Sequence, residues 1–138
     1  MKPARASRLC VIATALVYAT GLALAGEPRI TDVKWENACG GSNIRVTRVD
    51  GAIVAIDASV EHFHEARQWQ CHFLHGEIIS ALYRHSIVKR KVPADDGAVT
   101  TALYDDVITT YRFPDHKLTG MPRELTEDLR MVLAKATQ

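Results

Sequence analysis

The segment WQCHFLHGEIISALYR, residues 69–84, carries the clearest structural signal in the chain. Apolar and polar side chains alternate through residues 69–74, and residues 77–91 form a second run typical of a strand. A two-residue turn at His75-Gly76 predicts a hairpin with three facing pairs: Phe73 with Ile78, Cys71 with Ser80 and Trp69 with Leu82. These six residues would share one mostly apolar face, which leaves Tyr83 on the opposite face.

The segments on both sides of this hairpin also have strand patterns. Alternation or enrichment in β-branched and aromatic residues marks five runs: 30–36, 43–49, 52–60, 99–104 and 107–113. Asp50-Gly51 predicts a tight hairpin turn, because both central residues of such a turn need positive φ. Asp105-Asp106 is either a turn or a bulge in one long strand. Residues 61–68 either extend the preceding strand or form a short helix.

The C-terminal segment predicts a single amphipathic helix. Pro122 suits a first helical turn. Apolar residues then recur at helical spacing at Leu125, Leu129, Val132, Leu133 and Ala136. The predicted fold is therefore α+β: an antiparallel β-meander sheet packed by one C-terminal helix.

The N-terminal 25 residues have the pattern of a secretory signal. Three basic residues precede an uncharged run over residues 9–25, which ends in Ala23-Leu24-Ala25, a small-x-small cleavage pattern. We therefore expect cleavage, a periplasmic or secreted location, a single small domain over residues 26–138, and no stable membrane span afterwards. The alternative is an uncleaved anchor, although the run is slightly short for a span.

Removal of this segment changes the charge and cysteine content. Three of the 17 basic residues and none of the 16 acidic residues lie in it, so the remainder carries a formal net charge of −2. That balance argues against nucleic-acid binding. Cys39 and Cys71 remain, and an even count in an oxidising compartment predicts a disulfide. Closing such a loop would stabilise the fold by roughly 3–4 kcal/mol.

The leading functional hypothesis is a small protein-binding module in the envelope or outside the cell. One form of this hypothesis is an inhibitor or immunity-type protein that occludes a cell-wall hydrolase or a toxin. The helix covers one face of the sheet, so the other face, with Tyr83, is free for docking. The predicted contact residues are His75, Tyr83, Arg84, His85 and, in the loop 93–97, Asp95 and Asp96.

The alternative hypothesis is a periplasmic metal-binding protein. His62 and His64 would project from one face of a strand, and His72 would lie on its neighbour, a set that suits Zn²⁺ or Cu²⁺. Solvated polar-face histidines explain the same pattern more simply. The chain has no nucleophile-elbow, Walker or dinucleotide-binding motif, so we expect neither an enzyme nor a cofactor.

Overall fold

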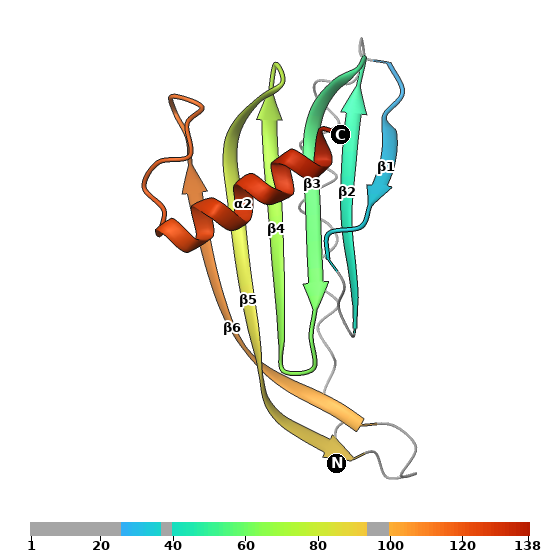
Figure 1. Ribbon diagram of the computed structural model, residues 1–138, viewed down its shortest axis with the longest axis vertical. Helices are drawn as coiled ribbons and strands as arrows, with labels where there is room; N and C mark the ends of the chain where they lie inside the picture. The colour runs from blue at the N-terminus through green and yellow to red at the C-terminus, as the bar shows by residue number, and fades with distance from the viewer. Residues whose placement is uncertain (1–25, 37–39, 94–99) are drawn as a thin grey trace, which may run out of the picture.

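The computed structural model describes residues 26–36, 40–93 and 100–138, which form one antiparallel sheet with one helix across a face (Figure 1). The elements are β1 Arg29–Val33, β2 Gly41–Val49, β3 Ala52–Glu61, β4 Glu65–Leu74, β5 Glu77–Pro93, β6 Thr100–Arg112 and α2 Arg123–Ala136. The six strands are hydrogen-bonded in chain order. This topology confirms the predicted α+β meander with a C-terminal helix. No described helix is long and apolar enough to cross a membrane.

Both predicted two-residue turns are confirmed. Asp50 and Gly51, between β2 and β3, have φ values of 50° and 82°. His75 and Gly76, between β4 and β5, have φ values of 51° and 78°. Two consecutive positive φ angles define a type I′ turn, whose twist matches that of the flanking strands. The sheet therefore follows from local turn chemistry at these two positions.

The core lies between the sheet and α2. The helix crosses β6, β5, β4 and β3 obliquely and ends near β2 (Figure 1). It buries Leu129, Val132 and Ala136 against strand residues that include Trp69. At its C-terminal end, the Arg48 guanidinium of β2 donates a hydrogen bond to the Ala136 carbonyl oxygen at 3.0 Å, which satisfies a carbonyl without a helical partner. We call the sheet face opposite α2 the second face.

The hairpin register differs from the prediction by one residue. Phe73 pairs with Ile78 as expected, but Cys71 pairs with Ala81 and Trp69 with Tyr83. The cause is a β-bulge, in which β5 has one more residue than β4 between these pairs. Because side chains alternate between faces, this single residue moves Tyr83 onto the helix side. The prediction that Tyr83 lies on the second face is therefore wrong.

The predicted Cys39–Cys71 disulfide is not supported. Cys71 is a free thiol, 1% exposed, in the core, whereas Cys39 lies outside the described residues. Gly40, next to Cys39 in the chain, donates its N–H to the Glu61 carbonyl. Glu61 is five residues along β3 from Ile56, the partner of Cys71, which is about 17 Å along a strand. A disulfide needs Cα atoms within about 7 Å of each other.

Two open points of the sequence interpretation are settled by the strand bounds. Asp105-Asp106 was expected to be either a turn or a bulge in one long strand. It lies inside the single strand β6, where its register with Ser86 and Ile87 of β5 is continuous. Residues 61–68 are neither a long extension of β3 nor a helix. The chain reverses at residues 62–64 and β4 begins at Glu65.

Candidate functional site

The predicted contact residues do not form one surface. Arg84 lies on the second face, whereas Tyr83 and His85 lie on the helix side, and Tyr83 is only 9% exposed. His75 lies in the β4–β5 turn, ten residues from His85, which is about 33 Å along β5. Asp95 and Asp96 lie outside the described residues. The side chains of β5 therefore offer two separate groups of contacts.

Each of these two groups contains a side-chain hydrogen bond to a carboxylate. On the second face, the Arg84 guanidinium donates from Nε to Asp106 Oδ2 at 3.2 Å, and this hydrogen bond lowers the pKa of the Asp106 carboxyl. On the helix side, His85 Nε2 and Glu65 Oε2 are 2.8 Å apart, and the hydrogen bond lowers the pKa of the Glu65 carboxyl. Both carboxylates therefore stay ionised to lower pH than usual.

The outer edge of β6 exposes an apolar strip. Leu103, Tyr104, Val107 and Ile108 are between 44% and 63% exposed. They belong to both faces of the strand, since side chains alternate. Exposed apolar side chains on an edge strand are available to a further strand that pairs beside it.

Among the described residues, the same edge presents backbone groups that no other strand pairs with. Val88, which pairs with Tyr104, donates its N–H to His64 on the other side of β5. Phe113, at the opposite end, donates its N–H to Ile79 of β5. Antiparallel strands alternate between inward and outward groups. The two bonds show that the odd-numbered residues of this part of β6 face β5. The N–H and C=O groups of every second residue therefore point outward, away from β5: those of Tyr104, Asp106, Ile108 and Thr110. We call these outward groups, together with the apolar strip, the β6 edge.

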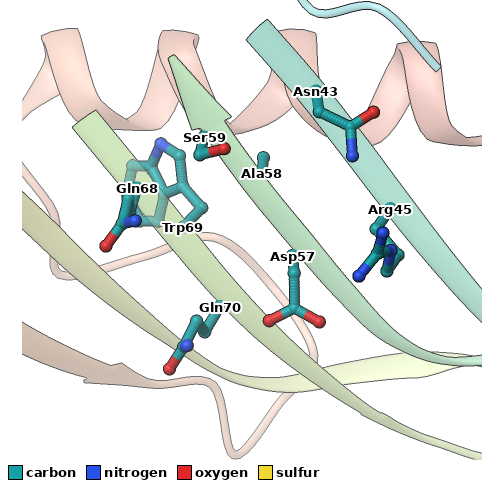
Figure 2. Close-up of a pocket in the computed structure, with 8 residues that line it drawn as sticks. All are labelled: Asn43, Arg45, Asp57, Ala58, Ser59, Gln68, Trp69 and Gln70. Atoms are coloured by element: carbon teal, nitrogen blue, oxygen red, sulfur yellow. The ribbon is translucent and has the colours of Figure 1, made fainter. Parts of the chain in front are cut away.

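A polar patch occupies the second face over β2, β3 and β4. Figure 2 shows Asp57 near its centre, between Arg45 of β2 and Gln70 of β4. The hollow has a volume of about 230 Å³. Desolvation raises the pKa of the Asp57 carboxyl, while the charges of His72 and Arg45 lower it. The patch offers donors and acceptors to a polar surface, in contrast to the β6 edge.

A polar network that the sequence analysis missed joins α2 to the sheet. Asp128 of α2 accepts hydrogen bonds from Arg67 Nη1 at 2.9 Å and from Trp69 Nε1 at 2.8 Å. Arg67 also donates to Glu36 Oε1 at 3.2 Å, and His62 Nε2 lies 2.7 Å from that same oxygen. Asp128 is 61 residues from Arg67, so no spacing motif reveals the pair. The sequence feature that could have indicated this contact is the position of Asp128, an acidic residue at the border of the apolar stripe of the helix.

The histidines proposed as metal ligands are not all brought together. His62 and His64 line one depression of about 410 Å³ beside Phe63 and Ile87. His62 and His64 lie in the turn between β3 and β4. His72 pairs with Ala55, whereas the pair nearest this turn is Ala66 with Glu61. His72 is thus about 20 Å along β4 from the turn. Across the described ranges, no three His, Cys, Asp or Glu side chains gather in a way that suits a metal ion. The described structure thus does not assemble the predicted ligand set.

Comparison of the chain with protein-family models, with curated proteins and with solved structures finds no match.

Proposed function

We propose that the protein is a binding module that accepts an extended segment of another protein as a further strand at the β6 edge. The observation that carries this proposal is the combination of outward backbone groups and exposed apolar side chains on one edge strand. Main-chain hydrogen bonds would supply affinity, and alternating side chains would supply specificity.

The composition of β6 supports this use. Natural edge strands are usually protected by charged residues, proline or irregular backbone. Residues 107–111, Val-Ile-Thr-Thr-Tyr, contain no charge, proline or glycine. Their register with residues 81–85 of β5 is continuous. A regular, uncharged edge of five residues can pair with another strand. In a protein without a binding partner, such an edge would promote aggregation.

The pattern of residues 1–25 supports a partner in the envelope or outside the cell. Occlusion of a cell-wall hydrolase or toxin by an inhibitor or immunity-type protein is the form of binding that we propose. The binding surface differs from the one expected from sequence. Of the predicted contact residues that the structure describes, Arg84 lies next to it through its cross-strand neighbour Ile108, and His85 lies next to it through Val107.

Proline substitution at the edge tests the proposal. Thr110→Pro removes an N–H that points outward, so the sheet should keep its own hydrogen bonds. The purified protein is used to capture its partner from envelope extract, and the affinity for the partner identified in this way is then measured by calorimetry. We expect the Thr110→Pro variant to bind at least about tenfold more weakly, which corresponds to about 1.4 kcal/mol.

Two controls make the result specific. Thr110→Val keeps the N–H and should bind normally, whereas Thr109→Pro removes an inward N–H that pairs with β5 and should destabilise the fold. Amide hydrogen exchange should show new protection of Ile108 and Thr110 in the complex. Undiminished binding by folded Thr110→Pro, or a captured strand that proves to be β6 of a second copy, would overturn the proposal.

A further inference from the structure

A second hollow lies on the helix side, between the N-terminal half of α2 and strands β4 and β5. It has a volume of about 430 Å³. We call it the α2 cleft. Its carboxylates come from Glu65 of β4 and from Glu124, Glu127 and Asp128 of α2. This cleft is separate from the outer side of β6, so a ligand bound in it does not depend on the proposed strand addition.

The charge of the α2 cleft is negative. Four carboxylates face one guanidinium, that of Arg67, and the imidazole of His85. Even with a proton on His85, the lining keeps an excess of negative charge. A concave surface lined by one sign of charge raises the local concentration of ligands with the opposite charge. The lining therefore favours a cation over an anion.

One of the four carboxylates has no ion-pair or hydrogen-bond partner among the described residues. Asp128 is held by Arg67 and Trp69, Glu65 by His85, and Glu127 by Arg123 at 2.9 Å. Glu124 makes no such contact within the described part of the chain. Its carboxylate is therefore the group available to a ligand.

The hydroxyl of a largely buried tyrosine also lines the α2 cleft. Tyr83 is 9% exposed, and its ring lies 4.5 Å from that of Trp69, centroid to centroid. Its hydroxyl has no hydrogen-bond partner among the described residues, and it is not one of the fully buried polar atoms, so it is accessible from the cleft. Burial raises the pKa of the Tyr83 hydroxyl, so the group remains a neutral donor and acceptor. A ligand with hydrogen-bonding atoms would satisfy it.

The remaining lining is apolar. Leu125 and Met131 of α2 stand beside the carboxylates, and Met131 is 40% exposed. Long basic side chains combine an aliphatic stem with a charged head. A stem of this kind matches the Leu125 and Met131 surface, while its head matches Glu124.

We propose that the α2 cleft binds the side chain of a lysine or arginine presented by another polypeptide. The aliphatic stem packs on Leu125 and Met131, and the ammonium or guanidinium donates to the Glu124 carboxylate. The Tyr83 hydroxyl gains a hydrogen-bond partner, which the described residues do not supply.

NMR titration of the purified protein tests this proposal. The probes are Nα-acetyl-lysine and Nα-acetyl-arginine N-methylamides, added at low salt. We expect saturable shifts of amides around the α2 cleft, with weaker binding as salt rises, because exposed ion pairs are screened. Glu124→Gln, which keeps the shape of the side chain, should weaken binding by about threefold or more.

Matched controls separate charge at the cleft from charge in general. Glu27→Gln removes an exposed carboxylate just before β1 and should leave binding unchanged. The norleucine analogue tests the stem alone, and the glutamate analogue tests an anion. The proposal would be overturned if either analogue bound as tightly as the lysine and arginine probes. It would also be overturned if the Glu124→Gln variant bound these probes as tightly as the unsubstituted protein does. Butylguanidinium binding as tightly as the arginine probe would overturn the assignment to a polypeptide side chain.

Discussion

The reactivity of the Cys71 thiol depends on which face of β4 the side chain occupies. The thiol lies in the core, and desolvation is the larger of two effects that raise its pKa to about 12. The negative charge of Asp57 adds to this effect. Since the thiolate is the nucleophilic form, Cys71 is chemically inert while the protein stays folded.

Alkylation tests this conclusion and the expected disulfide together. At pH 8, iodoacetamide should modify Cys71 in the folded protein only as fast as the protein unfolds, as measured by mass spectrometry of the Cys71 peptide. After unfolding in urea without reductant, modification should be fast. Rapid modification of the folded protein would contradict the burial. Protection that persists in urea would instead show that Cys71 is oxidised.

The same principle separates Tyr83 from Arg84, although they are neighbours in the chain. Tyr83 packs beneath α2, whereas Arg84 pairs with Asp106 on the second face. Adjacent residues of a strand cannot contribute to one side-chain surface. A cluster of promising residue types in the sequence is therefore not by itself a site.

At the scale of the elements, the tight turns set where each strand begins, and irregularities within strands set which face each residue occupies. The β4–β5 hairpin starts in the predicted register and leaves it after two pairs, at the bulge. A second shift occurs between Val88 and Arg90 in β5. Beyond the level of the β3–β4 turn, β5 and β6 continue as a bent two-stranded arm (Figure 1).

The β4–β5 turn depends on Gly76. Its φ of 78° is strained for any residue with a Cβ, whereas a Cβ there would meet no atom within 4 Å. Gly76→Ala should therefore lower the free energy of unfolding by about 1 kcal/mol through backbone conformation alone. Gly76→Asn should cost less, because asparagine tolerates positive φ. Urea denaturation measures both, and equal stability of Gly76→Ala would contradict the turn assignment.

At the scale of the whole molecule, the layers are held by apolar burial and by one polar junction. Asp128 joins α2 to both Arg67 and Trp69 of β4, and the Arg67 guanidinium lies 5.1 Å from the centre of the Trp35 ring. Through Glu36 and His62 the network extends to the β3–β4 turn. This junction orients the helix half that forms one wall of the α2 cleft.

Loss of the Asp128 charge should weaken the contact between the layers. Asp128→Asn leaves the largely buried Arg67 guanidinium, 22% exposed, without its closest carboxylate. We expect a loss of about 2 kcal/mol in the free energy of unfolding. Asp32→Asn is the matched control, because its pair with Arg45 is half exposed and should contribute much less to stability. Equal effects in urea denaturation would show that the junction adds no particular stability.

Local pattern was sufficient for the elements and their order. Alternation along 69–74, the Asp50-Gly51 and His75-Gly76 turns and the apolar stripe after Pro122 each reflect the preference of a short segment. Such preferences act before any distant contact forms, so one sequence is enough to recognise them. The α+β meander follows, because strands joined by two-residue turns must be antiparallel neighbours.

The candidate sites depended on tertiary structure. One extra residue in β5 placed Tyr83 in the core, and the strand bounds separated His72 from His62. Asp128 reached Arg67 only because α2 packs across β4. Faces, registers and pairings between residues far apart in the chain arise from packing the whole sheet against the helix, and that packing leaves no fixed spacing in the sequence.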